Sequence, residues 1–232
     1  LEDAYLSVVE SFNHASFKEH VNVKIKWVDS EFVTEENVAE KLGDVDGVIV
    51  PGGFGNRGIE GMIISAKYCR ETGLPYFGIC LGMQIAVIEY ARNVLGYKDA
   101  HSAEFAPEST HKVIDLMEAQ KSVETKGGTM RLGSYPCHVK EGSKAHKAYK
   151  ALIINERHRH RYEVNNDYRQ RFVEGGACFA GVAPDDSLVE EMEIPGHRFY
   201  LGVQYHPEFK SRPDRAHPIF AKFIKAAKEG RG

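Results

Sequence analysis

The sequence predicts an α/β protein in three layers, with a mostly parallel central sheet flanked by helices and with some antiparallel strands. Helical and strand patterns alternate along the 232 residues without an internal repeat. Two short apolar runs, ending at Pro51 and at Cys80, are typical of buried parallel strands. Apolar residues make up 42% of the chain and charged residues 27%, so the composition suits one sizeable core. We therefore expect residues 1–232 to form a single domain.

The spacing of apolar residues predicts the helices and strands of the first half of the chain. Helices are expected over 1–20, over 34–42 with Thr34 as N-cap, over 58–72 and over 81–95, where Gly96 ends the last one. Strands are expected over 21–27, where apolar and polar residues alternate, and over the buried runs 47–50 and 74–79.

The second half is richer in strands. These are expected over 113–117, 129–132, 157–164, 178–183, 188–194 and 199–205, followed by a basic helix over 217–228. The stretch 133–155 fits neither period well and is expected to be a loop followed by a helix.

Charge, cysteine usage and apolar runs exclude several classes of protein. The net charge of −3 argues against a protein that mainly neutralises nucleic-acid phosphates. A membrane span needs about 20 mostly apolar residues, and no apolar run in the sequence is that long. Four cysteines without a CxxC pair favour a reducing, cytoplasmic compartment, and no metal-ligand spacing occurs. Because the chain begins at Leu1, inside a helical pattern, we expect a fragment of a longer protein.

The strongest local signal surrounds Cys80. Gly78 and Gly82 flank it, and it lies between a predicted buried strand and a predicted helix, as in the Gly-x-nucleophile-x-Gly elbow. Small neighbours permit the sharp turn, and the helix that begins at Leu81 directs free N–H groups toward the sulfur, which favours the reactive thiolate. The alternative is a buried structural cysteine at a glycine-rich strand end.

Glycines also dominate the loop after the first apolar strand. Residues 52–58 contain four glycines, and loops at the carboxyl ends of parallel strands are common ligand sites in α/β proteins. The backbone amides could cradle a phosphate or stabilise an oxyanion, and a plain tight turn is the third possibility. The Lys-Ser/Thr pair of a phosphate-binding P-loop is absent.

A candidate base follows the strand over 199–205. His206 precedes Pro207, so its backbone should be extended, and Glu208 would then project on the same side. A carboxylate that orients a histidine beside a cysteine is the nucleophile–base–orienter arrangement. A surface His-Pro turn with a solvated Glu208 is the alternative.

Together these segments resemble the class I (triad) glutamine amidotransferases. The string 78–84 resembles their nucleophile motif and 206–208 their His-x-Glu motif. Further strings are similar to one branch of that family, the C-terminal glutaminase domains of CTP synthases; they lie at 51–55, 57–58, 60–62, 128–133 and 156–165. The resemblance extends over nearly the whole chain, although the strand that precedes the first helix in the family has no counterpart here.

The resemblance implies a role for each matching position. Cys80 would be the nucleophile and His206 and Glu208 would complete the triad, while the amides of Gly53 and Leu81 would form an oxyanion hole. The residues implied in glutamine binding are Gly53, Leu81, Gly82, Met83, Gln84, Glu104 and Arg161. Glu104 would hold the substrate ammonium and Arg161 its carboxylate, which suits a zwitterion. From the residues alone, Glu104 could be a solvated loop acid, and the arginines at 157, 159 and 161 could protect a strand edge.

The resemblance also implies the partners. The substrate would be L-glutamine, and no cofactor is expected in this domain. ATP, UTP and Mg²⁺ would act in a covalently linked synthetase domain that is absent here, and the full-length protein would be a homotetramer. Two other functions stay open: a cysteine-dependent hydrolase of γ-glutamyl peptides, and a nucleotide-sensing module that uses the glycine loop and the basic run 157–161.

Overall fold

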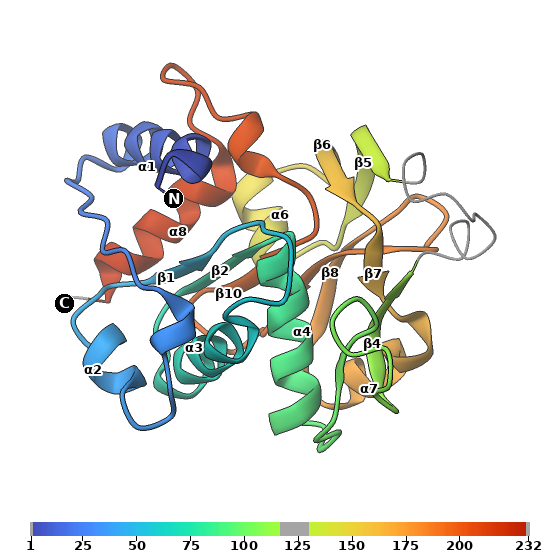
Figure 1. Cartoon of the computed structure of the whole chain (residues 1–232). Coiled ribbons are helices and arrows are strands. Elements are labelled where there is room, and N and C mark those ends of the chain that lie inside the picture. Colours follow the sequence, from blue (N-terminus) through green and yellow to red (C-terminus); the bar gives the residue numbers. More distant parts are fainter. Residues whose placement is uncertain (1, 117–129, 231–232) are drawn as a thin grey trace.

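The computed structural model describes residues 2–116 and 130–230, and its main feature is a seven-stranded sheet (Figure 1). In spatial order the strands are β1 (Val48–Val50), β2 (Tyr76–Ile79), β10 (Tyr200–Val203), β9 (Val189–Glu193), β8 (Cys178–Val182), β5 (Arg131–Val139) and β6 (Ile153–His160). A second, three-stranded sheet consists of β3 (His101–Ser102), β4 (Lys112–Leu116) and β7 (Tyr162–Val164).

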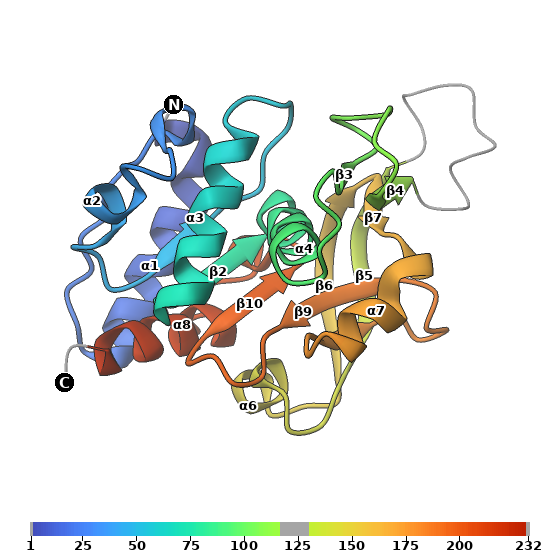
Figure 2. The ribbon, with the colours of Figure 1, turned by 90° about the horizontal axis from the view of Figure 1, so that it is seen from below.

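Helices cover both faces of strands β1, β2 and β10. In Figure 1, α1 (Leu6–Glu19) and α8 (Pro218–Glu229) lie above these strands, and Figure 2 shows α3 (Ile59–Thr72) and α4 (Leu81–Asn93) on the opposite face. Alternation along the strands produces the two layers, because Tyr76 packs in the cluster around α4 whereas Phe77 packs in the cluster around α1 and α8. The predicted α/β class with helices on both faces is confirmed.

Shorter helices lie at the periphery of the two sheets. They are α2 (Val38–Leu42), α6 (Lys144–Tyr149) and α7 (Arg169–Glu174), with 3-10 turns at Glu2–Tyr5, Ser30–Phe32, Asn166–Tyr168 and Pro207–Phe209.

The sheet contains more antiparallel pairs than the sequence predicted. Only β1–β2 and β2–β10 are parallel, while β10–β9, β9–β8, β8–β5 and β5–β6 are antiparallel. The physical reason is the length of the connections: β8, β9 and β10 follow one another through short loops, and a parallel pair needs a crossover of a dozen or more residues. The parallel part is therefore confined to the strands that carry the candidate nucleophile and base.

Several predicted elements differ from the structure. No strand forms over 21–27; this segment has no sheet partner, and Val21 and Val23 instead pack against the core beside α1. The helix predicted from Thr34 begins at Val38, because the side chain of Asn37 accepts a hydrogen bond from the Thr34 amide and holds the intervening residues in a turn. The strand predicted over 157–164 breaks at Arg161 into β6 and β7, which belong to different sheets.

Further differences lie in the middle of the chain. Most of the stretch 133–155 forms β5 and α6, and the start of β6 also falls within it. Met117 and Thr129, predicted as ends of two strands, lie outside the described residues.

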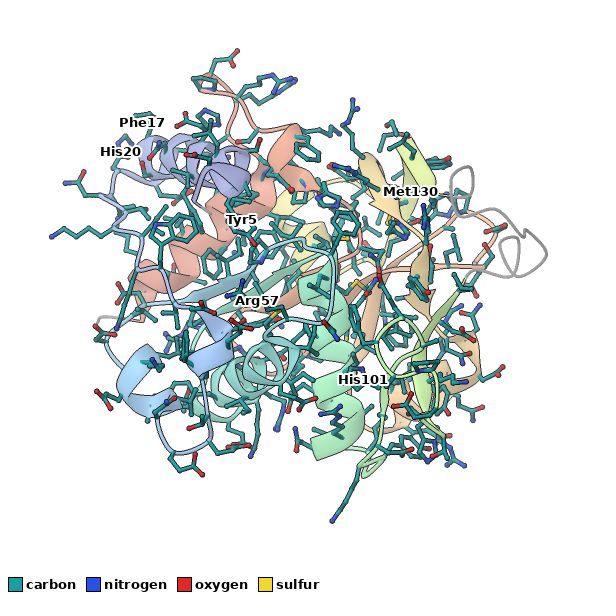
Figure 3. All side chains as sticks on the ribbon, in the orientation of Figure 1. Tyr5, Phe17, His20, Arg57, His101 and Met130 are labelled. Carbon is teal, nitrogen blue, oxygen red and sulfur yellow. The ribbon has the colours of Figure 1, made fainter. Side chains whose placement is uncertain are left out.

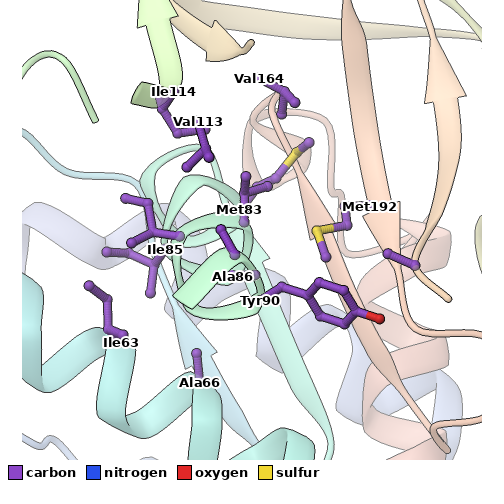
Figure 4. Packing of buried hydrophobic residues seen from close by; sticks show 14 of the residues in the cluster. Ile63, Ala66, Met83, Ile85, Ala86, Tyr90, Val113, Ile114, Val164 and Met192 are labelled. Carbon is purple, nitrogen blue, oxygen red and sulfur yellow. The ribbon is translucent and has the colours of Figure 1, made fainter. Parts of the chain in front are cut away.

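Helix α4 is the centre of the larger core. Every residue from Leu81 to Ala91 is buried. Figure 4 shows Met83, Ile85 and Ala86 of this helix among side chains from α3, from the small sheet and from β9. A helix that is buried all round needs partners on every side, and these elements supply them.

Two glycines allow the N-terminus of α4 to approach the sheet. A Cβ on Gly82 would collide with the carbonyl oxygen of Val50, and a Cβ on Gly78 would lie 2.5 Å from the carbonyl oxygen of Gly82. Real Cβ atoms do not come this close to backbone atoms, so α4 can begin directly against β1 and β2 only with glycine at both positions. The flanking glycines of the elbow thus serve a close approach of the backbone.

Gly82→Ala is expected to destabilise the protein by about 3 kcal/mol, because the added methyl would push α4 away from Val50. Gly196→Ala is the matched control, since a Cβ there meets no atom within 4 Å and both changes reduce unfolded-state entropy equally. Urea unfolding of the two variants measures the difference. Equal stabilities would contradict the proposed close approach.

Candidate active site

Three neighbouring strands end side by side and bring the candidate residues together. Val50 of β1 pairs with Gly78 of β2, and Gly78 pairs with Gly202 of β10. The carboxyl ends of these parallel strands therefore lie at one edge, where the glycine loop, Cys80 and the segment 204–208 begin. This is the edge at which open α/β sheets bind ligands.

Cys80 occupies a strained backbone position at the junction of β2 and α4. Its φ is 52° and its ψ is −101°, a conformation that non-glycine residues rarely adopt and that costs about 1–3 kcal/mol. The strand ends hold it there, because its amide donates a 2.7 Å hydrogen bond to the carbonyl of Val203 on β10. Cys80 as a whole is only 6% exposed. Such over-determined strain is common at functional sites.

The structure brings Glu208 to the ring of His206 and places that ring beside Cys80. His206 Nδ1 lies 2.7 Å from Glu208 Oε1, and both residues are buried. A Cβ built on Gly52 would lie 2.7 Å from His206 Cε1 and 3.6 Å from Cys80 Cβ, so Gly52 marks the point where the two side chains meet.

The contact between His206 and Glu208 arises in a different way from the one predicted. The backbone of His206, with φ −111° and ψ 84°, falls short of the extended conformation expected before Pro207, and Glu208 lies in the 3-10 turn Pro207–Phe209. The turn, rather than two residues of extended chain, brings the carboxylate back to the ring. The His206 amide also donates to the Arg157 carbonyl at 2.7 Å, and the ring stacks on Phe209.

The electrostatics of the site favour a protonated imidazole. Burial of His206 lowers its pKa, but hydrogen bonding to Cys80 and Glu208, together with their charges, outweighs burial and raises the pKa of His206 to about 10. Nε2 is buried and has no fully aligned hydrogen bond among the described residues. This nitrogen is therefore left to exchange a proton with the sulfur or with a bound substrate.

Gly53 and Leu81, the predicted oxyanion donors, are neighbours. A Cβ on Gly53 would lie 3.3 Å from Leu81 Cδ2. The hydrogen bonds of the first turn of α4 run from the amides of Met83 and Gln84 to the Cys80 carbonyl. Leu81 precedes both, so its amide is among the free N–H groups of the helix N-terminus. Two neighbouring amides beside the nucleophile could receive a developing oxyanion.

Three predicted glutamine-binding residues are built into the core. The Gln84 side chain is buried and its Nε2 donates to the Tyr162 carbonyl at 3.1 Å and to Gln204 Oε1 at 3.3 Å. The Met83 side chain is fully buried against Gly202, and Gly82 packs against Val50. Met83 and Gly82 can therefore contact a ligand only through the backbone.

Glu104 and Arg161 lie within electrostatic range of each other. Partial desolvation raises the pKa of Glu104, whereas the positive charge of Arg161 acts to lower it. Glu104 follows β3 of the small sheet, and Arg161 occupies the break between β6 of the large sheet and β7 of the small one. A carboxylate and a guanidinium are the groups that could hold the two ends of a zwitterion.

The rest of the glycine loop contacts its surroundings rather than the nucleophile. Arg159 lies over the Phe54 ring at 5.6 Å, and Arg57 pairs with Glu31 at 2.5 Å. Figure 3 labels Arg57 on this loop before α3. The arginines at 157 and 159 share the exposed face of β6, as predicted. The residues between and beside them, Glu156, His158 and His160, are buried.

The sequence reasoning missed Gln204. It is fully buried, and its Nε2 lies 3.6 Å from Cys80 Sγ. The signal was available, because residues two apart on an extended strand share one side, and Gln204 stands two before His206.

No metal site or membrane span is found in the described part of the chain. Over 2–116 and 130–230, no group of three or more His, Cys, Asp or Glu residues could hold a metal ion. No helix in these ranges combines the length and the apolar character needed to cross a bilayer.

Comparison with known families agrees with this geometry. The profile of the family "Glutamine amidotransferase class-I" matches residues 1–226. The chain therefore belongs to the class-I glutamine amidotransferases.

Within this class, the similarity is to CTP synthase. The chain is 57% identical over 227 residues to CTP synthase of Clostridium acetobutylicum and 55% identical over 229 residues to that of Bacillus subtilis. These matches cover 98% and 99% of this chain but only 42% and 43% of the relatives, so the chain spans less than half of their length.

Solved structures extend the comparison. The glutaminase domain of Trypanosoma brucei CTPS with bound acivicin superposes with a TM-score of 0.93 at 42% identity, covering 98% of this chain and 89% of that one. A putative GMP synthase component of Thermoplasma acidophilum, at 16% identity and a TM-score of 0.61, covers 94% of this chain and 89% of that one and shares the fold.

An NMR titration tests the electrostatics of the site. The His206 ring is expected to titrate with a midpoint near pH 10, and Cys80→Ala should lower the midpoint, because one of the groups that raises the pKa is removed. The imidazolium should persist below this midpoint and be lost as the pH rises through it. A wild-type His206 midpoint near the ordinary 6.5 would contradict the arrangement.

Proposed function

We propose that this chain hydrolyses L-glutamine to glutamate and ammonia through a thioester on Cys80. The observation that carries the proposal is the buried set of three: Glu208 holds Nδ1 of His206 at 2.7 Å, and the same ring interacts with Cys80. This is the nucleophile–base–orienter arrangement of acyl transfer. The similarity to a CTPS glutaminase domain supports glutamine as the substrate.

The first half-reaction forms the thioester. The Cys80 thiolate attacks the side-chain amide carbon of glutamine, and the amides of Gly53 and Leu81 stabilise the oxyanion, each typically contributing about 3–4 kcal/mol. When the tetrahedral intermediate collapses, the C–N bond breaks and the imidazolium of His206 gives its proton to the departing nitrogen. Ammonia leaves, His206 is neutral, and the acyl group remains on sulfur.

The second half-reaction restores the enzyme. Neutral His206 takes a proton from water, and the resulting hydroxide attacks the thioester carbon. The C–S bond then breaks, glutamate leaves, and the thiolate–imidazolium pair is regenerated. Glu208 keeps Nδ1 protonated throughout, so that proton exchange is restricted to Nε2.

The substrate would be positioned by Glu104 and Arg161 and by the backbone of the turn around Cys80. In this proposal Glu104 holds the ammonium of glutamine and Arg161 its carboxylate, while Gln84 contributes its remaining amide oxygen. Gly82 and Met83 take part through their backbone. The electrostatic interaction between Glu104 and Arg161, whose positive charge acts to lower the pKa of Glu104, supports this assignment.

The larger protein would use the ammonia. We propose that residues 1–232 act as one glutamine amidotransferase domain of a CTP synthase, in which a linked synthetase domain binds ATP, UTP and Mg²⁺ and converts UTP to CTP. The CTP synthase relatives, more than twice as long as this chain, support the linkage. In that form the protein would be a homotetramer.

The four cysteines, all unpaired, support a reducing, cytoplasmic location.

Glutaminase turnover tests the proposal. Cys80→Ala should lower ammonia release by at least about 10,000-fold, because no other group can form the thioester. Cys178→Ala, which removes a partly exposed thiol from β8, should leave turnover unchanged. Turnover that survives Cys80→Ala would contradict the proposal.

The same assay separates the two other functions. Faster hydrolysis of γ-glutamyl peptides than of glutamine would assign the triad to peptide hydrolysis. An electrophilic glutamine analogue should modify Cys80 of an enzyme, whereas a nucleotide-sensing module would leave the thiol unmodified.

A further inference from the structure

A second buried side chain besides His206 reaches the candidate nucleophile. Gln204 is fully buried, and its Nε2 lies 3.6 Å from Cys80 Sγ, within hydrogen-bonding range for sulfur. Gln204 and His206 stand two apart where β10 ends, so both project toward the nucleophile. Tyr205, between them, points to the other side, where its hydroxyl donates to Glu191 at 2.6 Å.

The surrounding contacts fix the orientation of the Gln204 amide. One terminal atom of Gln84 lies 3.1 Å from the Tyr162 carbonyl oxygen, which can only accept, so that atom must be the nitrogen. The same nitrogen lies 3.3 Å from Gln204, and the atom it meets there must therefore be the oxygen. The remaining terminal atom of Gln204, which faces the sulfur, is then its NH₂ group.

An amide nitrogen in this position can donate a proton to a hydrogen bond but cannot accept one. A thiolate accepts such a bond more strongly than a thiol does, because charge-assisted hydrogen bonds are stronger than neutral ones. Burial increases the difference, since water cannot replace the lost donor.

We propose that Gln204 is a further catalytic residue of this site, which donates a hydrogen bond to Cys80 Sγ and favours the thiolate, with Gln84 and the Tyr162 carbonyl holding its amide in the donating orientation. The proposal deepens the function proposed above and rests on it for its significance. Gln84 thereby gains a positioning role in addition to the substrate contact assigned to it.

The test measures the pH dependence of Cys80 alkylation by iodoacetamide, resolved by mass spectrometry. Gln204→Leu removes the donor, and Gln204→Glu replaces the NH₂ by an oxygen of nearly equal size while keeping the acceptor for Gln84. The pH of half-maximal alkylation should rise from wild type to Leu and further to Glu. The rate at neutral pH should fall about 10-fold in the Leu variant, the size expected for one hydrogen bond to a charged group.

Two controls separate this effect from a general loss of structure. Cys178, in the same molecules, should be alkylated with an unchanged profile in every variant. Gln170→Glu, an exposed change on α7, introduces the same charge and should leave the Cys80 profile unchanged. A Cys80 profile that stays at the wild-type value in the Leu and Glu variants, or that shifts only in proportion to a lower Tm, would overturn the proposal.

A measurement on the unmodified chain covers the case in which the variants do not fold. The side-chain amide resonance of Gln204 should move with the titration of Cys80 and move again on alkylation. A resonance that does not respond would overturn the proposal equally. Because iodoacetamide needs no glutamine, a chain that alkylates as expected yet releases no ammonia would refute the glutaminase proposal and leave the hydrogen bond established.

Discussion

The close contact between the N-terminus of α4 and the ends of β1 and β2 is the constraint on which the site depends. Gly82 lies against the Val50 carbonyl with no room for a side chain, and Gly78 lies against Gly82. With the helix in this position, Cys80 must turn through a left-handed backbone conformation, and the Val203 carbonyl on β10 receives its amide. The packing therefore determines where the sulfur lies, and the surrounding strands and the buried residues Leu81–Ala91 hold Cys80 in its strained conformation.

The second requirement is electrostatic. A histidine that is buried without partners becomes neutral, whereas the contacts of His206 with Glu208 and Cys80 reverse that tendency and raise its pKa to about 10. The carboxylate defines which nitrogen is free, and the glycine at position 52 lets the ring approach the sulfur without obstruction. A bound acyl group would thus meet a proton donor at His206 and backbone amides at Gly53 and Leu81.

The sequence could predict those parts that depend on local chemistry. The elbow around Cys80 and the buried strands follow from glycine spacing and apolar runs. The pairing of His206 with Glu208 was predicted as well, although a 3-10 turn rather than extended chain produces it. The short connections between the strands predicted over 178–183, 188–194 and 199–205 already favour antiparallel pairing there. The pairing of β5 with β6 and with β8, the break at Arg161 and the missing strand over 21–27 depend on which segments meet in space, and no local pattern records this. Gln204 was missed because its side chain is neutral and carries no titratable group. Its position two residues before His206, on the same side of the extended chain, was nevertheless readable from the sequence.

A crystal structure of the chain after reaction with an electrophilic glutamine analogue tests the central claim most directly. The account predicts a covalent bond to Cys80 Sγ, an acyl-derived oxygen within hydrogen-bond distance of the Gly53 and Leu81 amides, and the amino-acid end between Glu104 and Arg161. An adduct on another residue, or one on Cys80 whose oxygen points away from both amides, would contradict it.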